Sequence, residues 1–335
     1  MFKRWFVLLI VLCSVAVSAG AHALDRVGHL QPAGPAAQHF PSDFPVPNDA
    51  EWTGWKLGGF GGPTSQRSSH LPVIFVHGNN TDHGGWYPVA DEMTKSLGWK
   101  YGDLWALSYN GVGCSNDSAL FTTNNGYRGW TASNDRAAST GCVVTGDEQN
   151  VADLKAFIDA VLKYTHAPRV NIVAHSLGVT VARRMLWENP TYYAEVAAFV
   201  GIAGANHGTS FCPPGSEVDV ESCNEIAAGT PWLAEMNDGP MGRTPGTPGS
   251  NEAPGPTRWM TVYDGTGDGD PAFAGPTYAT SPQLKGAANC TFPDFYHNDL
   301  RVDPRIVRDY ASFLTAVEQH KSYSCPAPPP VGPSS

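Results

Sequence analysis

The sequence predicts an α/β fold in which a mainly parallel sheet is covered by helices on both faces. Short, unbroken apolar runs alternate along the chain with segments of helical periodicity. Strands that alternate with helices form the crossovers of a parallel sheet, and an unbroken apolar run is typical of a strand buried on both faces. The chain has 335 residues, of which 41% are hydrophobic and 16% charged, so it can bury a sizeable core.

Both ends of the chain are predicted to lie outside a catalytic-sized domain at 70–325. Basic residues and an apolar stretch lead to a small-residue site near Ala23, which is the pattern of a signal peptide at 1–23. We therefore expect a secreted, extracellular protein without a stable membrane anchor; an uncleaved anchor is the alternative. The Gly- and Pro-rich segment 24–69 predicts an irregular arm, and 326–335 predicts a disordered Pro-rich tail.

Within the domain, strands and helices are predicted in alternation. Strands are expected over residues 72–76, 104–109, 170–174, 196–203 and 258–263. Helices are expected over residues 86–97, 151–162, 181–186 and 304–317. The last helix begins at Pro304, a residue that fits the first helical turn, and Asp303 precedes it as a cap.

Two long connections interrupt this alternation, at 110–146 and at 209–257. The second is too long for an ordinary connection in a compact domain. We predict either a lid or substrate-contacting insertion, or a surface loop pinned by a disulfide.

Six cysteines remain after removal of the signal peptide. An even count in an exported chain predicts three disulfides. Each sequential pair brackets a loop-like segment or ties down the tail, so we expect the pairs Cys114–Cys142, Cys212–Cys223 and Cys290–Cys325.

The charge and the acidic residues exclude two classes of ligand. A net charge of −10 makes the chain a poor nucleic-acid binder. Asp264, Asp268 and Asp270 alternate as in a calcium loop, but Gly275 stands twelfth from Asp264, where that loop needs a bidentate acid. We expect no metal, no cofactor and a monomeric protein.

Ser176 is the predicted nucleophile. It lies in Ala174-His175-Ser176-Leu177-Gly178, where a buried strand meets a helix. A serine on such a tight strand-to-helix turn is lifted clear of the backbone, and the positions two before and two after it must be small. Ala174 and Gly178 meet that condition.

The tetrahedral intermediate of a serine hydrolase needs two backbone N–H donors, which form the oxyanion hole. One comes from the residue after the nucleophile, Leu177. The other comes from a loop after an earlier strand, where Asn79 is the candidate. His77, in the same loop, is predicted to shape the loop.

A histidine must accept the serine proton, and a carboxylate must orient that histidine. In this type of fold the acid precedes the histidine in the chain. His297 is the only histidine between the last predicted strand and the terminal helix, and we expect it to be the base. His207 is the rival and a candidate to line the pocket. His175 adjoins Ser176, where successive side chains diverge.

The segments at 72–79, 173–179 and 284–289 resemble the secreted bacterial lipases with an Ala-His-Ser-x-Gly elbow, and the related extracellular poly(3-hydroxybutyrate) depolymerases that lack a separate binding domain. The likeness covers roughly 72–317 and implies the α/β-hydrolase fold. Val179 replaces the second glycine of the small lipases, and Asn79 and Val179 look more like the depolymerases. The resemblance places the acid on Asp268, with Asp264 and Asp270 left open.

These features predict a carboxylic ester hydrolase that works through an acyl-enzyme. Candidate substrates are acylglycerols, short-chain esters and aliphatic polyesters. The alternatives are an acyltransferase that uses the same residues, and a binding protein on a hydrolase scaffold that has lost catalysis.

Overall fold

The structure is a computed structural model that describes residues 40–45, 59–78, 81, 83–107, 150–213, 221–238 and 252–327. In the described part of the chain, a seven-stranded sheet forms the centre of the fold. Its strands lie in the order β1-β3-β2-β4-β5-β6-β7. Neighbouring strands run parallel, except for the antiparallel pair β1–β3. The strands are β1 (Gly59–Phe60), β2 (Val73–Val76), β3 (Leu104–Leu107), β4 (Val170–His175), β5 (Val196–Ile202), β6 (Arg258–Tyr263) and β7 (Ala288–Thr291).

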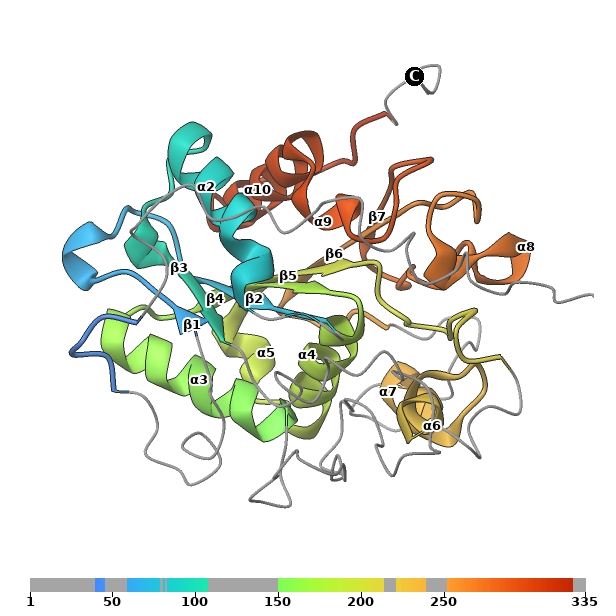
Figure 1. The fold of residues 1–335 in the computed structure, drawn as a ribbon. Helices are drawn as coiled ribbons and strands as arrows, with labels where there is room; N and C mark the ends of the chain where they lie inside the picture. Colours follow the sequence, from blue (N-terminus) through green and yellow to red (C-terminus); the bar gives the residue numbers. More distant parts are fainter. Residues whose placement is uncertain are drawn as a thin grey trace, which may run out of the picture.

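Helices cover both faces of the sheet, as the sequence predicts (Figure 1). One face carries α2 (Tyr87–Ser96), α9 (Asp299–Val302) and α10 (Pro304–Glu318). The other face carries α3 (Asn150–Thr165) and α4 (Leu177–Glu188). The shorter helices are α5 (Tyr192–Glu195), α6 (Glu221–Ile226), α7 (Pro231–Asp238) and α8 (Gly275–Tyr278).

The burial of the strands explains their unbroken apolar sequences. Every residue of β2, β3, β4 and β5 is buried, because side chains alternate between two faces that are both covered by helices. In α10 the buried residues recur at helical spacing, and the Asp303 carboxylate accepts a hydrogen bond from the Arg305 N–H. That bond satisfies one of the free N–H groups at the start of the helix.

Each predicted strand and helix has a counterpart in the structure, but some elements were missed. The edge strand β7 carries Asn289 and Thr291 and is only half-buried, so it lacks the apolar signal of a central strand. β1 lies in the segment predicted to be an irregular arm, where its Phe60 is fully buried. The short helices α6 and α7 lie in the insertion.

Two of the three predicted disulfides are confirmed. Cys212 bonds to Cys223 at a sequence separation of 11, and Cys290 bonds to Cys325 at a separation of 35. The second bridge joins β7 to the segment that follows α10. The pair Cys114–Cys142 falls outside the described residues.

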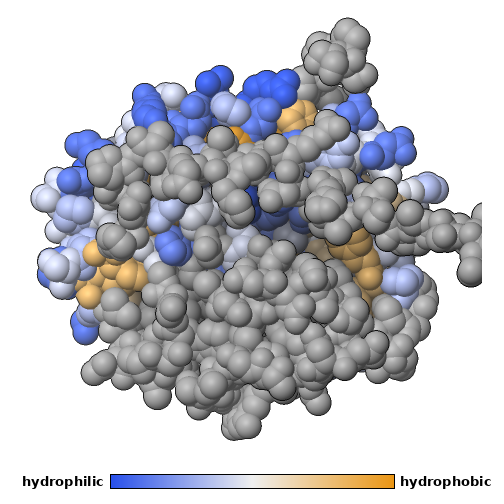
Figure 2. All heavy atoms as spheres, in the orientation of Figure 1, coloured by the Kyte–Doolittle hydropathy of each residue, from blue (hydrophilic) through white to orange (hydrophobic). Residues whose placement is uncertain are grey.

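Among the described residues, no helix is long and apolar enough to cross a membrane. The surface over α2 and α10 is largely hydrophilic (Figure 2).

The two disulfides should stabilise the fold to different extents. A cross-link removes more entropy from the unfolded chain when it closes a longer loop, which gives about 4 kcal/mol at a separation of 35 and about 3 kcal/mol at a separation of 11. The double variant C290A/C325A should therefore unfold at a lower temperature than C212A/C223A. Thermal unfolding of both variants beside the wild type measures this, and a larger loss in C212A/C223A would contradict it.

Candidate active site

The turn between β4 and α4 holds Ser176 in an unusual conformation. Its φ is 56° and its ψ is −131°, a backbone region that non-glycine residues rarely adopt and that stores strain. Two hydrogen bonds fix the turn: the Ser176 N–H donates to the Ile202 carbonyl at 2.8 Å, and the Val179 N–H donates to the Ser176 carbonyl at 3.0 Å. Ser176 stays partly exposed although His175 and Leu177 are buried.

Small residues around the turn allow it to form. A Cβ atom on Gly178 would lie 2.4 Å from the His77 carbonyl oxygen. A Cβ atom on Gly78 would lie 2.7 Å from the Ser176 Cβ. The chain that leaves β2 therefore packs directly against the turn at Ser176. Neither glycine can accept a side chain without a backbone shift.

His297 and Asp270 form a buried pair beside this turn. The His297 Nδ1 lies 2.9 Å from Asp270 Oδ2 and 3.0 Å from Asp270 Oδ1, and the two residues are 8% and 1% exposed. Since a carboxylate only accepts, Nδ1 carries the proton, which leaves Nε2 free to accept a proton in the neutral ring. The His297 ring centre lies 4.7 Å from that of His175, the residue before Ser176.

The resemblance favours Asp268 as the carboxylate beside His297, but the structure places Asp270 there, and not Asp268. Asp268 is exposed, and its N–H donates to the Thr266 hydroxyl at 3.2 Å. The chain reverses at Gly265 and Gly267, both with φ of 82°, so Asp268 points outward before the chain returns inward at Asp270. Spacing alone does not reveal such a reversal.

Asp264, the third open candidate, organises the loop. Its Oδ2 accepts hydrogen bonds from the Thr266 and Gly267 N–H groups at 2.9 and 2.8 Å. Its Oδ1 accepts from the Asp294 N–H at 2.6 Å. Because Asp294 lies three residues before His297, Asp264 ties the loop of the acid to the loop of the histidine.

Of the two residues predicted to form the oxyanion hole, the structure describes only one. Leu177 is the first residue of α4, so its N–H has no acceptor within the helix. Asn79 lies outside the described residues. Its neighbour Gly78 contacts Ser176, and the His77 Nδ1 lies 2.8 Å from the Gly78 carbonyl oxygen, in keeping with a loop-shaping histidine.

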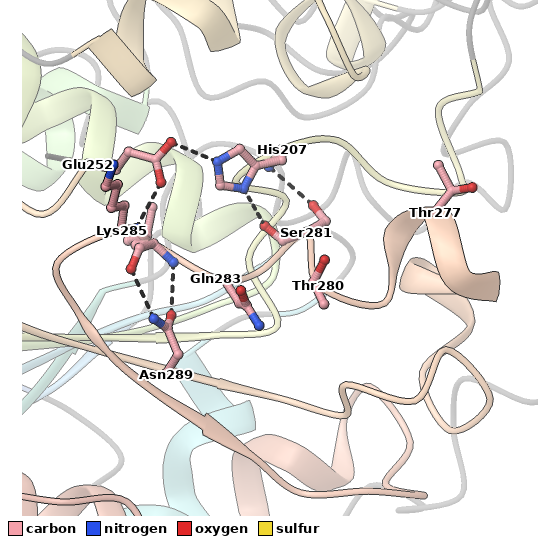
Figure 3. Close-up of a pocket in the computed structure, with 9 residues that line it drawn as sticks. His207, Glu252, Thr277, Thr280, Ser281, Gln283, Lys285 and Asn289 are labelled. Atoms are coloured by element: carbon pink, nitrogen blue, oxygen red, sulfur yellow. Dashed lines mark hydrogen bonds and ion pairs between the residues drawn. The ribbon is translucent and has the colours of Figure 1, made fainter. Parts of the chain in front are cut away.

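His207 lies in a separate pocket, where both of its ring nitrogens have partners (Figure 3). Nδ1 lies 2.9 Å from the Ser281 carbonyl oxygen, and Nε2 lies 2.9 Å from Glu252 Oε1. The pocket has a volume of about 400 Å³, and Thr277, Thr280, Gln283, Leu284, Lys285 and Asn289 complete its lining. His207 therefore pairs with Glu252 and not with one of the three aspartates.

Glu252 was missed in the sequence because it stands in a Gly- and Pro-rich stretch, 45 residues from His207. Burial would raise the pKa of this carboxyl. The hydrogen bond and charge of His207, the Lys285 N–H and the charge of Arg183 outweigh burial and lower it. The Lys285 N–H donates to Glu252 Oε2 at 2.9 Å.

A buried arginine also ties the insertion to the core. Arg183 on α4 donates from Nη1 to Asn206 Oδ1 at 3.0 Å and from Nη2 to Asn237 Oδ1 at 2.9 Å. Asn237 lies on α7, and its side-chain amide donates a hydrogen bond to the Asn206 carbonyl oxygen. Burial lowers the pKa of Arg183 to about 10, so the guanidinium remains charged at neutral pH. Hydrogen bonds between buried polar side chains thus attach α7 to α4.

Comparison with known proteins decides the family. Residues 70–243, more than half of the chain, match the family model described as Lipase (class 2). The chain belongs to the class 2 lipase family. No curated protein sequence matches it significantly.

The fold of this chain is similar to that of a solved lipase structure. A lipase from Bacillus licheniformis in its propeptide form aligns with 81% of the chain, at 14% identity and a TM-score of 0.53. The chain spans 55% of that protein's length. Lipase B from Aspergillus fumigatus aligns with 83% of this chain and 56% of its own, at 14% identity and a TM-score of 0.49. The first likeness confirms the predicted α/β-hydrolase fold.

Removing the charge of Glu252 should destabilise the protein in a pH-dependent way. A carboxyl whose folded pKa lies below its ordinary value of 4.5 stabilises the fold above that pH and loses this contribution as the pH falls through the folded pKa. Glu252→Gln should lower the free energy of unfolding at pH 7 by about 1–3 kcal/mol, and the difference from wild type should narrow below pH 4.5.

Urea unfolding at pH 7 and at pH 3.5 measures this difference. Glu235→Gln is the matched control, because Glu235 is 57% exposed and lies 3.6 Å from Arg184. It should change stability by less than about 0.5 kcal/mol. A Glu252→Gln variant as stable as wild type at pH 7 would show that the ion pair does not hold the insertion.

Proposed function

We propose that this lipase-family protein is a serine ester hydrolase with Ser176 as nucleophile, His297 as general base and Asp270 as the acid that orients the base. The observation that carries the proposal is the buried carboxylate 2.9 Å from His297 Nδ1, held beside a strained serine turn. Membership of a lipase family supports the ester as the substrate class.

The proposed reaction runs in two halves. Ser176 Oγ attacks the ester carbonyl carbon, and its proton passes to His297 Nε2. The tetrahedral intermediate places its negative oxygen at the Leu177 N–H and, in the proposal, at the Asn79 N–H. When the C–O bond breaks, the alcohol leaves with the proton from His297. Water then attacks the acyl-enzyme in the same way, and the carboxylic acid is released.

Asp270 contributes to both halves through the histidine. Its negative charge stabilises the imidazolium that forms whenever His297 holds the transferred proton. The Ala272 N–H also donates to Asp270 Oδ1 at 2.9 Å, which fixes the carboxylate in the orientation that faces Nδ1. A fixed carboxylate selects the tautomer in which Nε2 is the basic nitrogen.

The substrates that we propose are carboxylic esters, namely acylglycerols, short-chain esters and aliphatic polyesters such as polyhydroxyalkanoates. The polyester part rests on the sequence resemblance at Asn79 and Val179. Export is part of the proposal, and the two disulfides among the described residues support it, because such bonds persist in oxidising compartments. Hydrolysis of short and long p-nitrophenyl esters, emulsified triglyceride and polyester film tests the substrate class.

Ser176→Ala should abolish ester hydrolysis, with kcat lower by about 10⁶-fold, because the nucleophile is lost. The variant should also resist labelling by a fluorophosphonate while keeping the wild-type unfolding temperature. Ser312→Ala, which removes an exposed hydroxyl on α10, serves as the control and should keep full activity. Activity of Ser176→Ala within tenfold of wild type would rule out the proposed function.

Asp270→Asn should lower kcat by about 10⁴-fold, because an amide presents the wrong partner to the Nδ1–H and can hold the wrong tautomer. Asp268→Asn removes an exposed charge in the same loop and should cost less than about tenfold. Steady-state kinetics of the two variants on one p-nitrophenyl ester compares them directly. The reverse ranking would return the acid to Asp268 and leave the other roles in place.

A further inference from the structure

We propose that His175 is a positioning residue for the catalytic base: its neutral ring, protonated on Nε2, holds the main chain of His297 at a fixed place relative to Ser176. The inference rests on the proposed function, since it concerns the geometry of the same site. His175 does not touch the ester in this proposal and acts only through His297.

The contact itself is direct. His175 is the last residue of β4 and is 2% exposed. Its Nε2 lies 3.0 Å from the backbone carbonyl oxygen of His297. Since a carbonyl oxygen only accepts, Nε2 must carry the proton and donate it. The contact joins residues that are 122 positions apart in the chain.

The surroundings of the second ring nitrogen, Nδ1, determine the charge state of His175. The His175 Nδ1 is buried and has no hydrogen-bond partner among the described residues, so a second proton there would have no acceptor. Burial lowers the pKa of His175 well below its ordinary value, and the positive charges of His297 and Arg301 act in the same direction. His175 therefore stays neutral when His297 takes up the serine proton, and the donated hydrogen bond does not change during the reaction.

His297 needs such support because it lies in an irregular connection. Residues 292–298 link β7 to α9 without helix or strand, so no ladder of backbone hydrogen bonds fixes the chain there. Asp270 holds the imidazole ring through Nδ1, and His175 holds the main chain that carries the ring. Because His175 and Ser176 are consecutive, one turn sets the positions of both the nucleophile and the base.

Packing alone gives no reason for a histidine at this place. A buried nitrogen without a partner costs stability, and a leucine of similar size would avoid that cost. The hydrogen bond to the His297 carbonyl is the benefit that offsets it. The proposal therefore predicts that removal of the ring leaves the fold as stable as before and slows the reaction.

Two substitutions separate the donor from the volume of the side chain. His175→Leu keeps an apolar side chain but no donor. His175→Gln keeps an N–H donor near the place of Nε2. We expect His175→Leu to lower kcat by about 100-fold, the order expected for a misplaced catalytic group, with KM within threefold and an unchanged or higher unfolding temperature. We expect His175→Gln to recover kcat to within tenfold of wild type.

Thr180→Val is the matched control. Thr180 lies on α4, is 1% exposed, and its hydroxyl has no hydrogen-bond partner among the described residues. The change thus also removes a buried polar atom near the turn, but it leaves the His297 carbonyl untouched. Its kcat should stay within twofold of wild type.

A measurement on the wild-type protein covers the case in which a variant fails to fold. Nitrogen-15 NMR of labelled histidines should show one ring, absent from the spectrum of His175→Gln or His175→Leu, that is neutral and protonated on Nε2 from pH 5 to pH 9. A ring protonated on Nδ1, or charged at pH 7, would overturn the proposal.

The kinetic outcomes are distinct from a failure of the proposed function. The proposal is wrong if His175→Leu keeps kcat within threefold of wild type, or if His175→Gln is as slow as His175→Leu. In both cases, loss of activity in Ser176→Ala would still support the serine hydrolase mechanism. An active Ser176→Ala would instead overturn the function, and the positioning role with it.

Discussion

The turn at Ser176 is the constraint on which the rest of the site depends. A positive φ at a residue with a side chain costs about 1–3 kcal/mol, and here it persists because β4 and α4 are buried on either side of it. The turn also requires glycines at 78 and 178, where any larger residue would meet the backbone or Ser176 itself. The packing of the core around this turn thus positions Ser176, the proposed nucleophile.

The loops that surround this turn hold one another through polar side chains. The Thr209 hydroxyl donates to the Ala272 carbonyl at 2.5 Å, and the Ser210 hydroxyl donates to the Pro271 carbonyl at 2.7 Å. These bonds attach the loop after β5 to the loop that carries Asp270. Asp264 then attaches that loop to the one that carries His297. Because the carboxyl ends of parallel strands meet at one edge of the sheet, the loops that leave these strands assemble the site there.

The sequence predicted the fold and the tight turn at Ser176 well, because both follow from local rules. The strands β2, β4 and β5 are apolar throughout, and the small residues around Ser176 follow from the tight turn. The half-buried strand β7 gave no such signal. The sequence could not distinguish Asp270 from Asp268, because two glycines with positive φ, Gly265 and Gly267, turn the chain ahead of both residues, and residue spacing does not reveal such a turn.

For a related reason, contacts between residues far apart in the chain could not be predicted from the sequence. His175 and its neighbour Ser176 point in different directions, so no local pattern connects His175 with a carbonyl 122 residues away. Glu252 meets His207 where its own segment is hydrogen-bonded to Lys285 in the loop after β6. Both contacts depend on the path of an irregular segment, and tertiary packing determines that path.

The two edges of the sheet have a consequence for the behaviour of the protein at high concentration. An exposed edge strand is a template for pairing with another molecule, and long apolar edges promote aggregation. In the described part of the chain, β1 has two residues and β7 has four. The disulfide at Cys290 also fixes the 325 end of the chain beside β7. Among the described residues, neither edge therefore offers a long, uncovered row of backbone donors and acceptors, an arrangement that resists sheet-to-sheet growth into fibrils.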